Sequence, residues 1–201
     1  MAALLPCRAV QQILSGRSWV LAALALALAG CGGIAPTTYV HPNYDFSRVK
    51  RVAVLPLDNL STDQMAGEKM RVVIMTELLS TGIVDVVELG QVNRVLTQLN
   101  IQNIRGMSPD EFKRVAATVA AQLVVIGSVE SFDRVQVGGV QAPEVTLTLR
   151  GVEAESGSVV WATSVTEGGA TVSARLFGLT GDSLSEVARR AAHDAVATLF
   201  R

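Results

Sequence analysis

Residues 51–57 read Arg-Val-Ala-Val-Leu-Pro-Leu, a short apolar run rich in valine. A run of this length and composition predicts a largely buried strand that ends at Pro56. A second run of the same kind, Leu-Val-Val-Ile-Gly-Ser-Val, occupies residues 123–129. Buried strands need helices packed against their sheet, so the two runs favour an α/β fold.

The residues between these runs predict helices and a further strand. Ser61 or Thr62 is placed to cap a helix that runs to about Thr81. Residues 84–88 then predict a second strand. Apolar side chains at helical spacing over residues 89–99 form one face of a second helix.

The strongest local signal is Ser-Pro-Asp-Glu at residues 108–111. Ser108 supplies the N-cap, Pro109 presets the backbone at the first helical position, and Glu111 closes a capping box. Apolar residues over 112–123 give this third helix a buried face. The helix leads directly into the second buried run.

The C-terminal third predicts an antiparallel strand pair and a last helix. Residues 145–149 and 159–165 alternate between apolar and polar, and the intervening Gly157 suits a tight hairpin turn. Ser183 and Glu186 form a second capping box before a helix with an alanine-rich side. The full order is βαβααβββα, an α/β fold in which helices pack on a mixed sheet.

The N-terminus has the features of a secretory signal. Two arginines precede an apolar run of 11 residues at 19–29, whereas a membrane-spanning helix needs about 20. We therefore expect residues 1–30 to be a cleaved signal peptide. Residues 31–48 lack helical or strand periodicity and are expected to form a flexible tether, and residues 49–201 the folded domain.

The end of the apolar run, Leu28-Ala29-Gly30-Cys31, resembles the lipobox of bacterial lipoproteins. In that family small residues admit the signal peptidase and the Cys thiol accepts a diacylglyceryl group. The resemblance thus implies cleavage after Gly30 and lipidation of Cys31. A secreted protein with a chance cysteine at the cleavage site is the alternative. Gly32 follows the Cys where an Asp would direct otherwise, which implies delivery to the outer membrane by similarity to lipoproteins of enteric bacteria.

Charge and cysteine content restrict the partners. The net charge is −1, and loss of Arg8 and Arg17 with the signal reduces the basic side chains from 17 to 15 against 18 acidic ones, a net −3. This balance excludes the basic face that nucleic-acid binding needs, and it leaves membrane attachment to acyl chains. Cys7 also leaves with the signal, so Cys31 has no second thiol with which to form a disulfide.

Several phrases resemble the CsgG superfamily of bacterial envelope lipoproteins, which includes the curli secretion channel and the LpoB type of peptidoglycan-synthase activator. They are RVAVLPLDNLS at 51–61, LLSTG at 78–82, VDVVELGQVNRVLTQLN at 84–100, AAQLVVIGSVESF at 120–132 and LRGVEAESGSVVWA at 149–162. The similarity covers most of residues 49–200 and implies a periplasmic domain that binds other proteins. Trp161, in the last phrase, is expected to be half-buried on its strand.

The residues favour neither a channel nor an enzyme. Each strand of a transmembrane hairpin needs about 9 to 11 residues. The two places where a hairpin could grow, 131–143 and 168–181, are too short unless they take in most of their flanking strands. His41 and His193 are the only histidines and support no catalytic pair, and there is no Cys/His cluster for zinc.

The sequence therefore predicts a non-enzymatic lipoprotein of the outer membrane, with a periplasmic domain that serves as a binding or assembly module and uses no cofactor. Its protein partner in the envelope stays open. The alternatives are a subunit of a curli-type secretion channel and an LpoB-like synthase activator, for which a tether of about 16 residues is a short arm. A homo-oligomer is a further prediction, because the alanine-rich side of the helix at 183–200 could pack on a neighbour.

Overall fold

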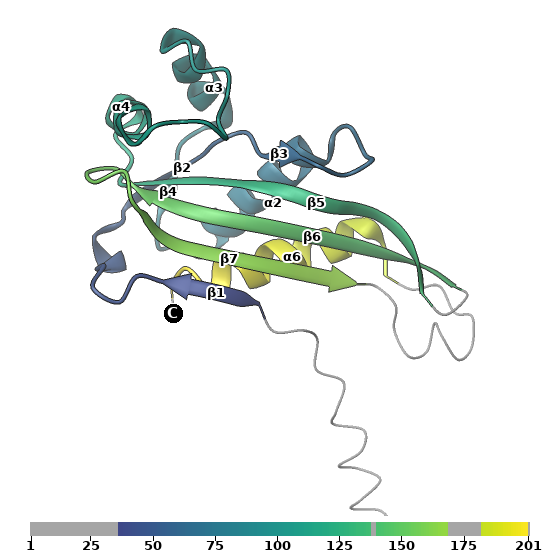
Figure 1. Ribbon diagram of the computed structural model, residues 1–201. Coiled ribbons are helices and arrows are strands. Elements are labelled where there is room, and N and C mark those ends of the chain that lie inside the picture. The colour runs from purple at the N-terminus through teal and green to yellow at the C-terminus, as the bar shows by residue number, and fades with distance from the viewer. Residues whose placement is uncertain (1–35, 138–139, 169–181, 201) are drawn as a thin grey trace, which may run out of the picture. The chain divides into compact units, whose positions relative to one another are not determined.

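The computed structural model describes residues 36–137, 140–168 and 182–200 (Figure 1). Within these ranges seven strands form one sheet in the order β1-β7-β6-β5-β2-β4, with β3 paired to β5. β2 pairs in parallel with β4 and β5, whereas β5, β6, β7 and β1 pair antiparallel. The predicted mixed sheet is confirmed. The strands are β1 (Thr37–Val40), β2 (Arg51–Val54), β3 (Asp58–Asn59), β4 (Asp85–Val86), β5 (Leu123–Val137), β6 (Val140–Glu153) and β7 (Val159–Gly168).

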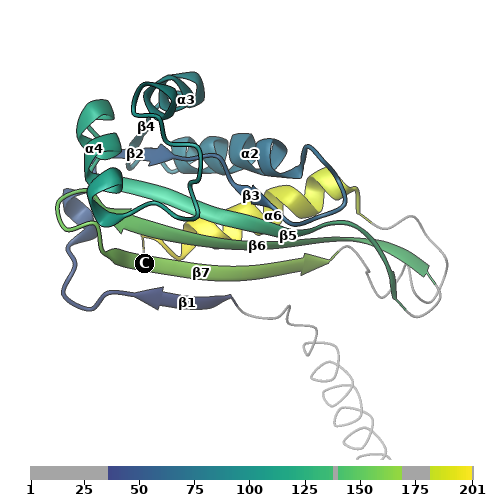
Figure 2. The ribbon, with the colours of Figure 1, turned by 45° about the horizontal axis from the view of Figure 1, so that its top comes forward.

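Helices lie on both faces of this sheet (Figures 1 and 2). One core joins the sheet to α2 and α6, and a second core joins its other face to α3 and α4. The predicted order βαβααβββα is confirmed, with β1, β3 and a short 3-10 turn, η1, in addition. The helical elements of the described ranges are η1 (Phe46–Arg48), α2 (Ala66–Ser80), α3 (Leu89–Gln98), α4 (Pro109–Val119) and α6 (Leu184–Ala197).

The two helices with the clearest capping signals begin where the sequence places them. Ser108 caps α4, and its reciprocal bonds with Glu111 complete the predicted capping box. Ser183 caps α6 by accepting the backbone N–H of Glu186 at 3.2 Å. Each helix then presents its apolar side to the sheet.

The helix α2 begins later than predicted. Ser61 and Thr62 do not cap it; Met65 is its N-cap residue and forms no side-chain cap bond. The Ser61 hydroxyl instead donates to Asn59 at 2.8 Å, and the Thr62 hydroxyl donates to Asp133 of β5 at 2.5 Å. These bonds hold residues 61–64 as a loop against β3 and β5, so a cap-forming residue type is used for loop anchoring.

The predicted tether is wrong from residue 37 onward. Residues 37–40 form β1, whose register pairs Thr37 with Ser164 and Val40 with Trp161 of β7. Asp45 then caps η1 by accepting the Ser47 N–H at 3.0 Å. Four β-prone residues at a sheet edge are too few to show a strand period, and their pairing partner lies far away in the sequence.

β5 and β6 are much longer than predicted. The sequence places strands at 123–129 and 145–149, but the ladder continues to the pair Val137–Val140. Polar residues interrupt the apolar pattern there, and the register shifts between Val129 and Ser131. β7 ends at Gly168, opposite Glu144, so the last part of the β5–β6 hairpin extends beyond β7 (Figures 1 and 2).

The alanine-rich side of α6 lies inside the molecule. Ala188, Ala191, Ala192 and Ala195 are buried against the sheet and α2. The argument that this side packs on a neighbouring copy is therefore wrong, because small side chains here allow α6 to approach its own sheet. Trp161 is also 1 % exposed rather than half-buried.

Candidate functional site

The residues singled out in the sequence do not gather at one place. The lipobox, residues 28–31, lies outside the described ranges, so lipidation of Cys31 stays a prediction. His41 follows β1, and its ring Nδ1 accepts the Asn43 N–H at 3.3 Å. His193 lies on the surface of α6 and pairs with Glu77 of α2 at 3.3 Å. The two histidines thus serve separate local contacts.

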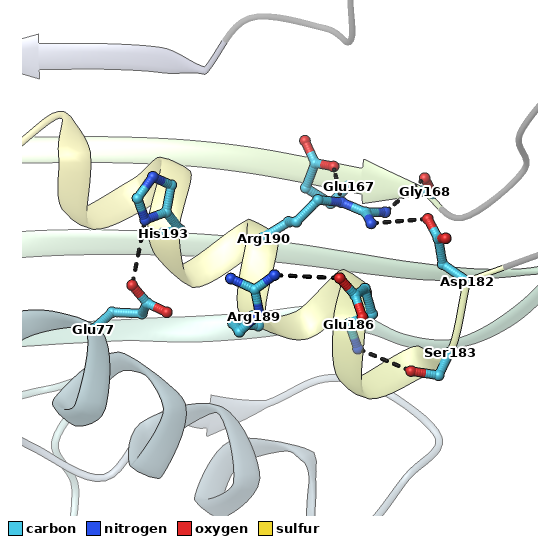
Figure 3. A network of polar contacts seen from close by, with 9 residues as sticks. All are labelled: Glu77, Glu167, Gly168, Asp182, Ser183, Glu186, Arg189, Arg190 and His193. Carbon is cyan, nitrogen blue, oxygen red and sulfur yellow. Dashed lines mark hydrogen bonds and ion pairs between the residues drawn. The ribbon is translucent and has the colours of Figure 1, made fainter. Parts of the chain in front are cut away.

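Polar contacts fasten α6 to its neighbours (Figure 3). The Arg190 guanidinium lies 2.8 Å from Asp182 and 3.4 Å from Glu167 at the end of β7. Burial raises the pKa of the Glu167 carboxyl, the nearby Asp194 adds to this, and Arg190 opposes it. Since each of these groups pairs with a neighbour, we interpret this network as a structural one.

A buried arginine closes the place where open α/β sheets commonly bind ligands. The chain leaves β2 into α2 on one face and leaves β4 into α3 on the other. The crevice between two such strands is the usual ligand site. Here Arg71 of α2, 0 % exposed, donates from Nε and Nη2 to the Val54 carbonyl at 3.1 and 2.9 Å.

The same guanidinium also reaches the opposite layer. Its Nη1 donates to Asn93 of α3 at 2.9 Å, so Arg71 joins α2 and α3 across the end of β2. Burial lowers the pKa of Arg71 from its ordinary value, and the charges of Glu68 and Glu88 oppose that shift. The crevice is therefore filled by the protein's own side chain.

An open cleft of about 750 Å³ lies at the other end of β6 from the hairpin tip. One wall is the side and C-terminal end of α4, where four alanines leave a shallow apolar surface. The other walls are the loop after β1 and the turn between β6 and β7. Its principal lining residues are His41, Tyr44, Asp45, Arg48, Lys113, Ala116, Ala117, Ala120, Ala121, Glu153 and Glu155.

Charges of both signs surround the apolar floor of this cleft. Burial raises the pKa of the Tyr44 phenol and the Glu153 charge adds to this, so the hydroxyl stays protonated and available as a donor. Hydrogen bonds from Ser47 lower the pKa of Asp45, which keeps that carboxylate charged. Arg48 and Lys113 supply the cations. Such a lining suits a protein segment with an apolar side chain and polar neighbours.

Two further findings concern metals and membranes. Within the described ranges no group of three or more His, Cys, Asp or Glu side chains is placed to hold a metal ion. Among the helices there, none is both long and apolar enough to cross a membrane.

The family model for the peptidoglycan-synthase activator LpoB matches residues 38–166, well over half of the sequence. The chain belongs to the LpoB family. The match begins within β1 and ends within β7, so it spans the sheet of the LpoB domain but not α6. A family of synthase activators accords with the prediction of a non-enzymatic protein. Membership of the wider CsgG superfamily stays a prediction.

Solved structures show how widely this LpoB-family fold occurs. The PelC dodecamer from Paraburkholderia phytofirmans has 19% sequence identity and a TM-score of 0.57, covering 82% of this chain and 98% of PelC. The lipoprotein GNA1162 from Neisseria meningitidis has 17% identity and a TM-score of 0.53, covering 75% of this chain and 97% of its own. At these identities the likeness concerns the fold. A search of curated proteins found no match.

The sequence did not indicate the cleft as a site. Its apolar wall consists of alanines that the periodicity assigned to the buried face of α4 or to the residues after it. Its other walls come from residues 41–48, which were expected to be flexible, and from Glu153 and Glu155 beside a turn. The signal that could have revealed the cleft is the pairing of β1 with β7, which brings residues 41–48 to α4.

Proposed function

We propose that this chain is an envelope lipoprotein that binds and activates a peptidoglycan synthase. The family match over residues 38–166 carries this proposal. It supports the activator alternative over both a curli-type channel and an unspecified assembly module. The signal-like N-terminus and Cys31 supply the outer-membrane anchor, with the domain in the periplasm.

The cleft is the surface we assign to the synthase. It lies at the end of the domain where β1 finishes, so it is far along the sheet from the residue that follows the anchor segment. The alanine wall accepts an apolar side chain of the partner, while Tyr44, Arg48 and Lys113 offer donors to its backbone or acidic groups. Neither a metal nor a catalytic group is required of this domain.

The short anchor segment places a condition on this function. Because β1 begins at Thr37, only residues 32–36 separate Cys31 from the sheet. Fully extended, the six residues from Cys31 to Thr37 span about 20 Å. The activator therefore stays at its own membrane, and the synthase has to present a segment that reaches it.

A pair of neighbouring substitutions tests the binding surface. Ala117 is exposed and lines the cleft, whereas Thr118 is exposed on the same helix but does not line it. Ala117→Trp fills the cleft and should weaken binding of the synthase about tenfold, equivalent to about 1.4 kcal/mol. Thr118→Trp, the matched control, should bind as the parent does.

The assay combines binding with activity. A synthase captured from envelopes of the source organism is purified, its affinity for the chain is measured by titration, and glycan polymerisation is followed with and without each variant. Stimulation by the parent and by Thr118→Trp, but not by Ala117→Trp, is the expected result. No stimulation by the parent would refute the activator function, and equal stimulation by both variants would refute the cleft.

A further inference from the structure

The place where β1 enters the sheet determines how far the anchor can hold the domain from a membrane. β1 runs antiparallel to β7, so the chain before Thr37 leaves the sheet toward the C-terminal end of β7. The tip of the β5–β6 hairpin points to this same end (Figure 1). Both the anchor and the hairpin therefore lie on one side of the domain.

The hairpin is longer than the anchor segment. Thr37 pairs with Ser164, which pairs with Thr148, and the ladder continues from Thr148 to the last pair at Val140. These eight residues extend about 26 Å along the strand beyond the level of Thr37. The chain from Thr37 back to Cys31 spans about 20 Å at most. A membrane that holds Cys31 on this side thus meets the hairpin.

The chemistry of the hairpin end suits lipid headgroups. Residues 134–137 and 140–143 contain one charged residue, Arg134, which is exposed. Gln136 and Gln141 are exposed on neighbouring strands and offer amide donors. A cation and amide groups can bind headgroup phosphates, and this part of the hairpin has no carboxylate to repel them.

We propose that the β5–β6 hairpin end rests on the phospholipid headgroups of the membrane that holds the anchor, with the cleft turned away from it. This inference rests on the lipid anchor of the proposed function and extends it. The occupant of the hairpin end is the lipid surface, and the orientation leaves the cleft free for the synthase. The anchor and the fold thereby fix the direction in which the domain presents its binding surface.

Fluorescence quenching in vesicles tests this orientation. Acylation consumes the Cys31 thiol and Cys7 leaves with the signal, so an engineered cysteine is the single free thiol of the lipoprotein. Gln136→Cys places a fluorophore on the hairpin. Asp110→Cys places it at the opposite end, because the adjacent Pro109 packs against Gly157 in the β6–β7 turn. The purified acylated variants are bound to vesicles of phosphatidylethanolamine and phosphatidylglycerol that contain a lipid with a headgroup nitroxide.

The expected result is several-fold stronger quenching at position 136 than at position 110. A flexible Gly/Ser insertion of about a dozen residues between Gly33 and Ile34 should remove this difference without releasing the protein, because it lets the domain move away from the bilayer. Vesicle-bound protein with equal quenching at both positions would overturn the orientation alone. Protein that is unacylated and does not bind the vesicles would overturn the anchor as well as the orientation, whereas the synthase assay tests activation separately.

Discussion

Replacement of Arg71 tests how the two helical layers are joined. Its guanidinium forms two hydrogen bonds to the Val54 carbonyl and one to Asn93, at 2.9 to 3.1 Å, from a fully buried position. Hydrogen bonds to charged groups contribute about 1.5–3 kcal/mol each. The cost of burying the charge offsets several kcal/mol of that sum. We therefore expect Arg71→Ala to lower the free energy of unfolding by about 3 kcal/mol.

A second substitution separates lost hydrogen bonds from lost packing. Arg71→Met keeps most of the side-chain volume but still removes the donors from Val54 and Asn93, so it should cost about 2 kcal/mol. The matched control is Arg114→Ala, which removes an exposed arginine 4.0 Å from Glu111 and should cost less than about 0.5 kcal/mol. Both Arg71 effects are a substantial fraction of the about 5–15 kcal/mol by which a folded domain is typically stable.

Urea unfolding followed by far-ultraviolet circular dichroism measures these differences. The expected result is a lower midpoint for both Arg71 variants at an unchanged slope, and a midpoint near that of the parent for Arg114→Ala. If Arg71→Met were as stable as the parent, the hydrogen bonds across the end of β2 would contribute nothing, and the reasoning would be refuted.

Two further substitutions test the attachment of α6 and a helix cap. Thr198→Val leaves the Trp161 indole N–H, now 3.1 Å from the Thr198 hydroxyl, without an acceptor, and should cost about 1–3 kcal/mol in urea unfolding; an unchanged midpoint would contradict this bond. Backbone N–H groups of Gly90 and Gln91 lower the pKa of Glu88 below its ordinary value of 4.5. Its contribution to stability is therefore full above that value and is lost as the pH falls through the lower pKa of the folded state. Glu88→Gln should reduce the loss of Tm on acidification, and an undiminished loss would count against the cap.

Local signals predicted the layers of the fold. The buried runs became β2 and the first half of β5, and the Ser-Pro-Asp-Glu motif became the start of α4, because neighbouring residues decide such features. Gly157 takes the left-handed φ of 70° that its turn requires. The spacing of apolar residues in the last helix also gave its buried face correctly, although not what that face contacts.

Long-range pairing was beyond the sequence. β1 depends on a partner more than 120 residues away, and without it residues 37–48 resemble a tether. The outer half of the β5–β6 hairpin is held by cross-strand pairing rather than by an apolar pattern. Trp161 proved fully buried because α6, a distant element, covers it and Thr198 accepts its N–H. The cleft could not be predicted either, since three separate segments meet to form it.

The pairing of β1 with β7 also has a kinetic consequence. A chain delivered from its N-terminus exposes Thr-Thr-Tyr-Val early, yet the strand that receives these residues arrives more than a hundred residues later. Contacts of such high sequence separation form slowly. Until then the future edge strand is a sticky, unprotected segment on a long leash, and its late docking shortens that leash and draws the nearly finished domain in toward its own N-terminus.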